Sequence, residues 1–102
     1  MTDAPNPPLG FSIQRGLDLI HVGKVHVAIV HFEHFAHQKP VTEEVVVAMR
    51  QTGVLYRILH RFQAAEEYLT DALEAAKQLK KPELAESIQA DLDKTWHDIA
   101  RS

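Results

Sequence analysis

Proline, the residue that most readily interrupts a helix, is confined to three places in this chain of 102 residues. Three of the five prolines fall within residues 1–8, MTDAPNPP, and the other two are Pro40 and Pro82. A proline inside a helix removes a backbone hydrogen bond and clashes with the preceding turn. The proline-free stretches 9–39 and 41–81 also carry apolar residues three and four positions apart, which is the helical spacing. The sequence therefore predicts an all-α fold.

We expect about five helices joined by short connections. Their expected ranges are about 9–22, 25–38, 43–59, 62–79 and 82–100. Thr42 is a suitable N-cap for the third helix, and Glu43 and Glu44 in its first turn complement the helix dipole. Pro82 suits the first turn of the last helix. Because the connections are short, neighbouring helices should pack as antiparallel hairpins.

Composition restricts the classes of function. Hydrophobic residues make up 45% and charged residues 25%, which is ordinary for one globular domain. A formal charge of -3 gives no support for a nucleic-acid partner, and the absence of cysteine excludes disulfides and thiolate metal sites. No apolar run approaches the roughly 20 residues of a membrane span. We expect a cytoplasmic protein without membrane association, with a disordered Pro-rich leader at 1–8 and a single domain at 9–102.

The two predicted hairpins are copies of each other at a fixed offset of 37 residues. The matching pairs are Gly16 and Gly53, Leu19 and Tyr56, Ala28 and Ala65, Phe32 and Leu69, and Phe35 and Ala72. A period in this range is typical of stacked helical repeats. In each copy the glycine would let the first helix approach the second, and Leu19 or Tyr56, three residues later, would fill the gap. The alanine of the second helix would let the helices cross, and Phe32 or Leu69 would close the core.

The segments TGVLYRILHRFQAAEEYLTDAL and RGLDLIHVGKVHVAIVHFEHF, with Pro40 after the second, carry this pattern. It resembles the tetratricopeptide repeat, W-x2-L-G-x2-Y followed by A-x3-F and a late proline. The resemblance implies repeat one at about 9–40, repeat two at about 41–80 and a capping helix at about 82–101. It further implies a right-handed stack of hairpins that acts as a non-catalytic protein-interaction module. His60 departs from the pattern because it stands where the family has a turn glycine.

In that family, the first helix of each hairpin, here named the A helix, lines a surface that binds peptides. The residues expected on this surface are Ile13, Leu17 and Ile20 from the first helix and Val47, Arg50, Val54, Arg57 and Arg61 from the third. Arginine can hold a carboxylate with two parallel hydrogen bonds, and an apolar stripe can accept a hydrophobic anchor. We therefore predict a protein or peptide partner, which could carry an acidic segment. The same residues could instead be core residues and solubilising charges.

Two alternative functions remain open. The apolar stripe of the first helix could serve self-association in a small homo-oligomer. The segment HFEHFAHQ could bind a divalent metal, with His34, His37 and Glu33 as weak candidate ligands. Helical spacing, however, distributes these residues around the side of the helix expected to face solvent, and a zinc site needs three or four converging ligands. We expect no cofactor, and no motif of a catalytic site occurs in the sequence.

Overall fold

The computed structural model describes residues 9–101, with side chains from residue 13 onward, and the expected leader at 1–8 lies outside the described residues. Its regular structure over this range consists of five helices, α1 (Leu9–His21), α2 (Val25–Ala36), α3 (Glu43–Ile58), α4 (Phe62–Gln78) and α5 (Pro82–Arg101). The predicted all-α class is confirmed, and each helix begins and ends within two residues of its expected range. None of these helices is long and apolar enough to cross a membrane.

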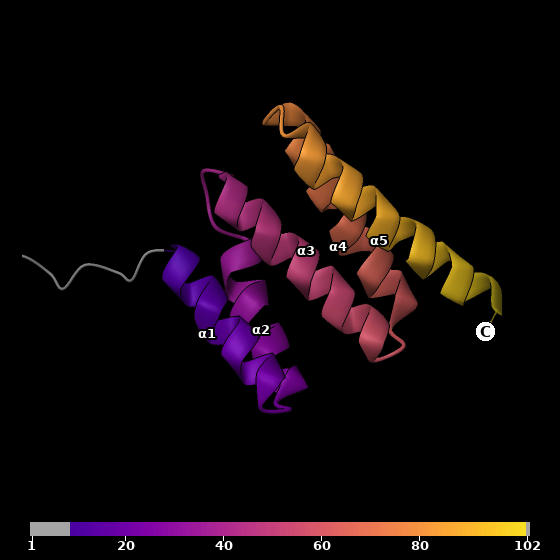
Figure 1. Cartoon of the computed structure of the whole chain (residues 1–102), viewed down its shortest axis with the longest axis horizontal. Helices are drawn as coiled ribbons and strands as arrows, with labels where there is room; N and C mark the ends of the chain where they lie inside the picture. Colours follow the sequence, from indigo (N-terminus) through magenta and orange to yellow (C-terminus); the bar gives the residue numbers. More distant parts are fainter. Residues whose placement is uncertain (1–8, 102) are drawn as a thin grey trace, which may run out of the picture.

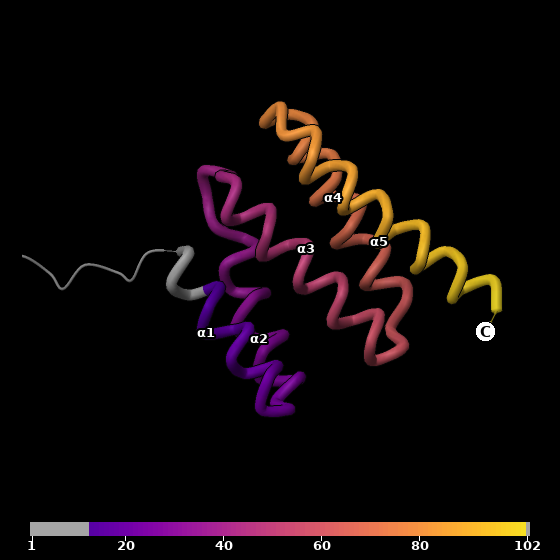
Figure 2. The backbone as a smooth tube through the Cα atoms, in the orientation of Figure 1, coloured from indigo at the N-terminus to yellow at the C-terminus, as the bar shows by residue number. Residues whose placement is uncertain are grey.

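The five helices form two layers (Figure 1). The A helices α1 and α3 and the last helix, α5, run in the same direction along one layer, and α2 and α4 lie behind them. Each helix packs against its neighbours in sequence, and α3 also contacts both α1 and α5. The tube in Figure 2 shows the chain advancing from α1 at one end of the array to α5 at the other. The A helices therefore share one surface, as a stack of hairpins requires.

The two hairpin turns and the turn between α4 and α5 have the same backbone conformation. Each contains one residue with a positive φ angle, namely Gly23, His60 or Lys80. The next N–H bonds to the carbonyl five residues earlier, in the pairs Lys24 to Leu19, Arg61 to Tyr56 and Lys81 to Ala76. This is the Schellman arrangement that ends many helices, and glycine is its preferred residue at the positive φ. The chain thus reverses its direction at the end of three helices through the same turn geometry.

The core confirms the packing predicted from the 37-residue offset. A Cβ atom at Gly53 would lie 2.7 Å from Leu69, and one at Gly16 would collide with the ring of Phe32. Leu69 and Phe32 are both fully buried. The two glycines therefore perform the same task, which is to let a large side chain of α4 or α2 fill the space between the helices of its hairpin.

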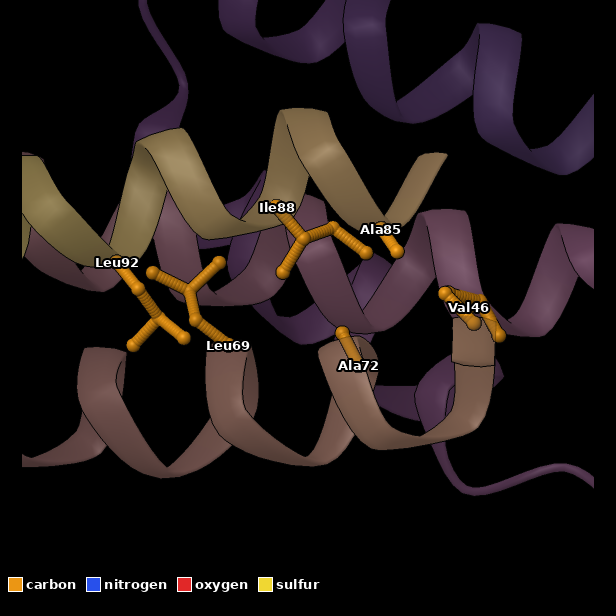
Figure 3. Packing of buried hydrophobic residues seen from close by; sticks show 7 residues of the cluster. Val46, Leu69, Ala72, Ala85, Ile88 and Leu92 are labelled. Atoms are coloured by element: carbon orange, nitrogen blue, oxygen red, sulfur yellow. The ribbon is translucent and has the colours of Figure 1, made fainter. Parts of the chain in front are cut away.

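The last helix covers the second hairpin. Ala85, Ile88 and Leu92 of α5 form a buried cluster with residues that include Leu69 and Ala72 of α4 (Figure 3). The α5 helix is therefore an integral part of the core.

The α3 helix begins at the N-cap expected from the sequence. The hydroxyl of Thr42 accepts a hydrogen bond from the N–H of Val45, 3.4 Å away.

Candidate interaction surface on the A helices

The apolar residues predicted for the A-helix surface are shared between that surface and the core. Ile13 and Ile20 are half-buried and pack against the cluster around Phe32. Val54 is also half-buried, and it packs against the cluster between α4 and α5. Leu17, by contrast, is 38% exposed. Of these side chains, Leu17 is the one most available to a partner.

Val47, the fourth apolar residue of α1 and α3 besides Leu17 that was predicted for this surface, is likewise half-buried.

Ile58 is an exposed apolar residue that was not predicted from the sequence. Ile58, the last residue of α3, is 52% exposed. It stands four residues after Val54 and therefore lies on the same side of α3. Extending the stripe by one helical turn would have identified it in the sequence.

Arg50 is already engaged within the molecule. Its Nε donates to Oδ2 of Asp91 on α5, 2.6 Å away, and the Asp91 side chain is largely buried. A hydrogen bond between ionised groups at this distance is among the stronger polar contacts in proteins. The guanidinium of Arg50 therefore ties α3 to α5, which limits what it can offer to a partner.

The expected basic stripe does not continue beyond α3. The helix ends at Ile58, so Arg61 lies past the turn, where it is the N-cap residue of α4. The spacing that placed Arg61 on the stripe assumed an uninterrupted helix, and the positive-φ residue His60 interrupts it. Arg57 remains on α3, is half-buried, and has no ion pair within residues 13–101. Arg57 is therefore the charge of the stripe that is open to an acidic partner.

A cluster of polar side chains joins the two hairpins. The hydroxyls of Tyr56 and Tyr68 both donate to Oε2 of Glu33, at 2.8 and 2.9 Å. Nε2 of His37 lies 3.0 Å from the Tyr68 hydroxyl. Because Tyr68 gives its only hydroxyl proton to Glu33, His37 must donate the Nε2–H in this contact. One carboxylate thus connects α2 to α3 and α4.

This cluster corrects the expectation that Glu33 and His37 lie away from any helix contact. The α2 helix packs on α1 on one side and on α3 on the other, so its buried arc is wider than that of a helix with a single partner. Ile29 is accordingly buried, and Glu33 follows it by four residues at the edge of the same contact. A helical wheel that assumes a single buried face could not show that Glu33 and His37 contact another helix.

The environment of the two tyrosines favours their neutral form. Burial raises the pKa of both hydroxyls, and the hydrogen bond to Glu33 and its negative charge raise these pKa values further. At Tyr56 the positive charge of Arg61 acts weakly in the opposite direction.

The candidate metal ligands do not converge. Over the described part of the chain, no three histidine or carboxylate side chains come close enough together to hold a metal ion. Glu33 and His37 are both bonded to Tyr68, and His34 is exposed. The polar cluster is therefore a contact between helices, with tyrosine hydroxyls where a metal site would need further ligands.

The chain has no match among protein-family models, curated proteins or solved structures. Its own geometry therefore carries the functional argument. The helices α1 and α3, which contact each other, carry two exposed apolar side chains, Leu17 and Ile58, and Arg57 of α3 has no ion pair within the described residues.

Proposed function

We propose that this protein is a non-catalytic protein-interaction module that binds a partner peptide or helix on its A-helix surface. The observation that carries the proposal is the pairing of exposed apolar side chains, Leu17 and Ile58, with Arg57. Contiguous exposed apolar residues commonly mark contact sites, and the proposal assigns Leu17 and Ile58 to one such surface because their helices pack against each other. The resemblance of the sequence to the tetratricopeptide repeat, whose A helices bind peptides, supports the same surface.

The chemistry of this surface defines the partner. Leu17 and Ile58 offer apolar contacts for a hydrophobic anchor, and Arg57 can form a forked hydrogen bond with a carboxylate. The partner should therefore carry a large apolar residue close to an acidic one. The absence of cysteine fits a reducing compartment, so we propose that this binding takes place in the cytoplasm.

The ion pair between Arg50 and Asp91 decides which residues can test the proposal. Reversing the charge of Arg50 would place two carboxylates together beneath α5, so a loss of binding could simply reflect a loss of structure. Arg57 and Ile58 have no such partner in the described residues, and their side chains can be changed without breaking a known contact of this kind.

The test is selection of peptides from a random displayed library on the full chain, followed by measurement of their affinity. Selected peptides should combine an acidic residue with a large apolar one. Arg57→Glu and Ile58→Glu should each weaken their binding by about tenfold or more, and added salt should weaken it too. The matched control is Val30→Glu, which places the same new charge on an exposed residue of α2.

Two results would argue against the A-helix surface. One is selected peptides that bind the Arg57→Glu and Ile58→Glu variants as tightly as the original chain. The other is binding that is lost in the Val30→Glu control, because that result would move the site to α2. Circular dichroism of each variant would establish that the helices remain formed.

A further inference from the structure

A second candidate contact surface lies where α5 packs on α4. Trp96 and Ile99 of α5 are 45% and 39% exposed, and their spacing of three residues places them on one side of the helix. Trp96 is the only tryptophan of the chain. Tryptophan offers a large apolar area and is enriched among the residues that contribute most to protein contacts. An indole ring left almost half exposed on a helix therefore identifies a candidate contact residue.

The Trp96 ring is held in position by the neighbouring helix. Its Nε1–H donates to Oε2 of Glu66 on α4, 2.5 Å away. Glu66 is half-buried, and a carboxylate can accept more than one hydrogen bond. Because the ring is already oriented, binding at its exposed part costs less conformational entropy than binding to a mobile side chain.

The charge beside the ring is negative. Asp93 is exposed and precedes Trp96 by three residues, so it lies next to the ring on the same side of α5. The basic residues Lys94 and Arg101 stand two residues before Trp96 and five after it, and these spacings place them on other sides of the helix. The Trp96 side of α5 therefore combines an aromatic ring with carboxylates.

This surface and the A-helix surface lie on different sides of α5. Asp91 of α5 bonds to Arg50 of α3, whereas Trp96 bonds to Glu66 of α4. The helices α3 and α4 belong to different layers of the array (Figure 1). A partner bound at Trp96 thus leaves α1 and α3 free to bind another one.

We propose that Trp96, Glu66 and Asp93 bind an arginine side chain of a partner protein. The face of an indole ring attracts cations, and it does so more strongly than the rings of tyrosine and phenylalanine. A guanidinium is planar and weakly hydrated, so it stacks on the ring while its N–H groups donate to the carboxylate of Glu66 at the ring edge. Exposed Ile99 provides an apolar contact for the stem of the arginine.

The charge of this surface defines the chemistry of its partner. An acidic segment, the class proposed for the A-helix surface, would meet two carboxylates at Trp96 and be repelled. A purely apolar segment would contact Trp96 and Ile99 but would leave Glu66 and Asp93 without a partner as water is displaced. An arginine satisfies the ring and the carboxylates together.

The single tryptophan reports directly on this site. The experiment selects peptides on the full chain from a displayed library with a central arginine and no acidic residue, since such peptides lack the carboxylate proposed to bind Arg57. Adding a selected peptide should change the fluorescence of Trp96 in a saturable manner. Replacing its arginine by citrulline, which has nearly the same shape and no charge, should raise the Kd by about tenfold or more.

Variants of the chain separate the ring from the charge. With a labelled peptide, Trp96→Leu and Glu66→Gln should each raise the Kd by about tenfold, as measured by fluorescence anisotropy. Glutamine can still accept the indole N–H, so Glu66→Gln keeps the ring in place and removes only the charge. The control Glu86→Gln removes one charge from another exposed position of α5, and Ile58→Gln changes the A-helix surface. Both controls should leave the Kd unchanged.

The proposal is overturned if the library yields no peptide that changes the fluorescence of Trp96. A citrulline peptide that binds as tightly as its arginine counterpart would overturn it too, as would a Kd that Trp96→Leu or Glu66→Gln leaves unchanged. Loss of affinity in Ile58→Gln would move the peptide to the A-helix surface. Fluorescence that changes with protein concentration alone, as the mass rises above 11.5 kDa, would assign the Trp96 surface to a second copy instead.

Discussion

At the scale of single residues, the fold depends on two glycines, whose lack of a side chain leaves space for a neighbouring residue. Gly53 and Gly16 leave the space that Leu69 and Phe32 occupy. We predict that Gly53→Ala lowers the free energy of unfolding by about 1–3 kcal/mol, because the new Cβ must displace the fully buried Leu69. Chemical denaturation would measure the change. The matched control Ala90→Gly, at an exposed site on α5, should cost only the helix propensity of glycine, about 1 kcal/mol or less.

An unchanged stability in Gly53→Ala would contradict the packing that relates the two hairpins. The variant Gly53→Ala/Leu69→Val separates this effect from a backbone effect. A smaller side chain at Leu69 leaves room for the added Cβ, so the second change should cost less in the Gly53→Ala background than it does alone.

The tyrosine cluster predicts a dependence of stability on pH. Tyr56 and Tyr68 have pKa values raised above the ordinary value of 10.0, so the folded state favours the neutral hydroxyls. Their contribution is therefore complete below pH 10 and is lost as the pH rises from there through the raised pKa values. These are the only two tyrosines of the chain. Tyr56→Phe/Tyr68→Phe should lower stability at pH 8 and should make its decline between pH 10 and pH 11.5 less steep.

Denaturation curves at several pH values would check this prediction. Lysines titrate in the same range, but they are common to both proteins and so cancel in the comparison. An equally steep decline in the original chain and the double variant would mean that the hydroxyls near Glu33 do not govern alkaline stability.

At the scale of helices and turns, the structure identifies a residue that is poorly suited to its position. His60 adopts a positive φ in the turn between α3 and α4, where the equivalent residue of the first hairpin is Gly23. A left-handed conformation costs a residue with a Cβ about 1–2 kcal/mol. We predict that His60→Gly raises the free energy of unfolding by about 1 kcal/mol. Lys80→Gly should act in the same direction, since Lys80 has the same conformation.

Thermal denaturation would check both variants. The control Gly23→Ala puts a Cβ where only open space surrounds it, so any loss of stability would come from the backbone alone. A lower melting temperature for His60→Gly would show that its ring, which contacts Phe62 edge to face, contributes more than the strained turn removes.

Helix ends and the internal repeat could be predicted from the sequence because local signals define them. Pro40, Thr42 and Pro82 delimit helices through their own backbone chemistry, and the paired glycines repeat at a fixed interval. The polar contacts could not be predicted in this way. Arg50 and Asp91 stand 41 residues apart, and no local pattern indicates that α5 would cross near Arg50. The hydrogen bonds from Tyr56 and Tyr68 to Glu33 also join residues far apart in the sequence, so no local pattern predicts them.

At the scale of the whole molecule, exposed apolar side chains occur on different helices, so the A-helix surface can be tested against a control elsewhere in the array. The A-helix surface contains Leu17, Arg57 and Ile58, whereas Val27 and Val30 are exposed on α2. A charge at Ile58 should weaken the binding of the partner. A charge at Val30 should leave that binding unchanged, so Val30→Glu is the control for Ile58→Glu.

We propose above that a partner binds across the A helices α1 and α3. The most direct test is an NMR titration of the full chain with a peptide selected from the displayed library, following the backbone amides. We predict that the largest shift changes lie around Leu17, Val54 and Ile58 and that Arg57→Glu moves the titration to peptide concentrations at least about tenfold higher. Changes concentrated instead around Val27 and Val30, or along α5, with the amides of α1 and α3 unaffected, would contradict it.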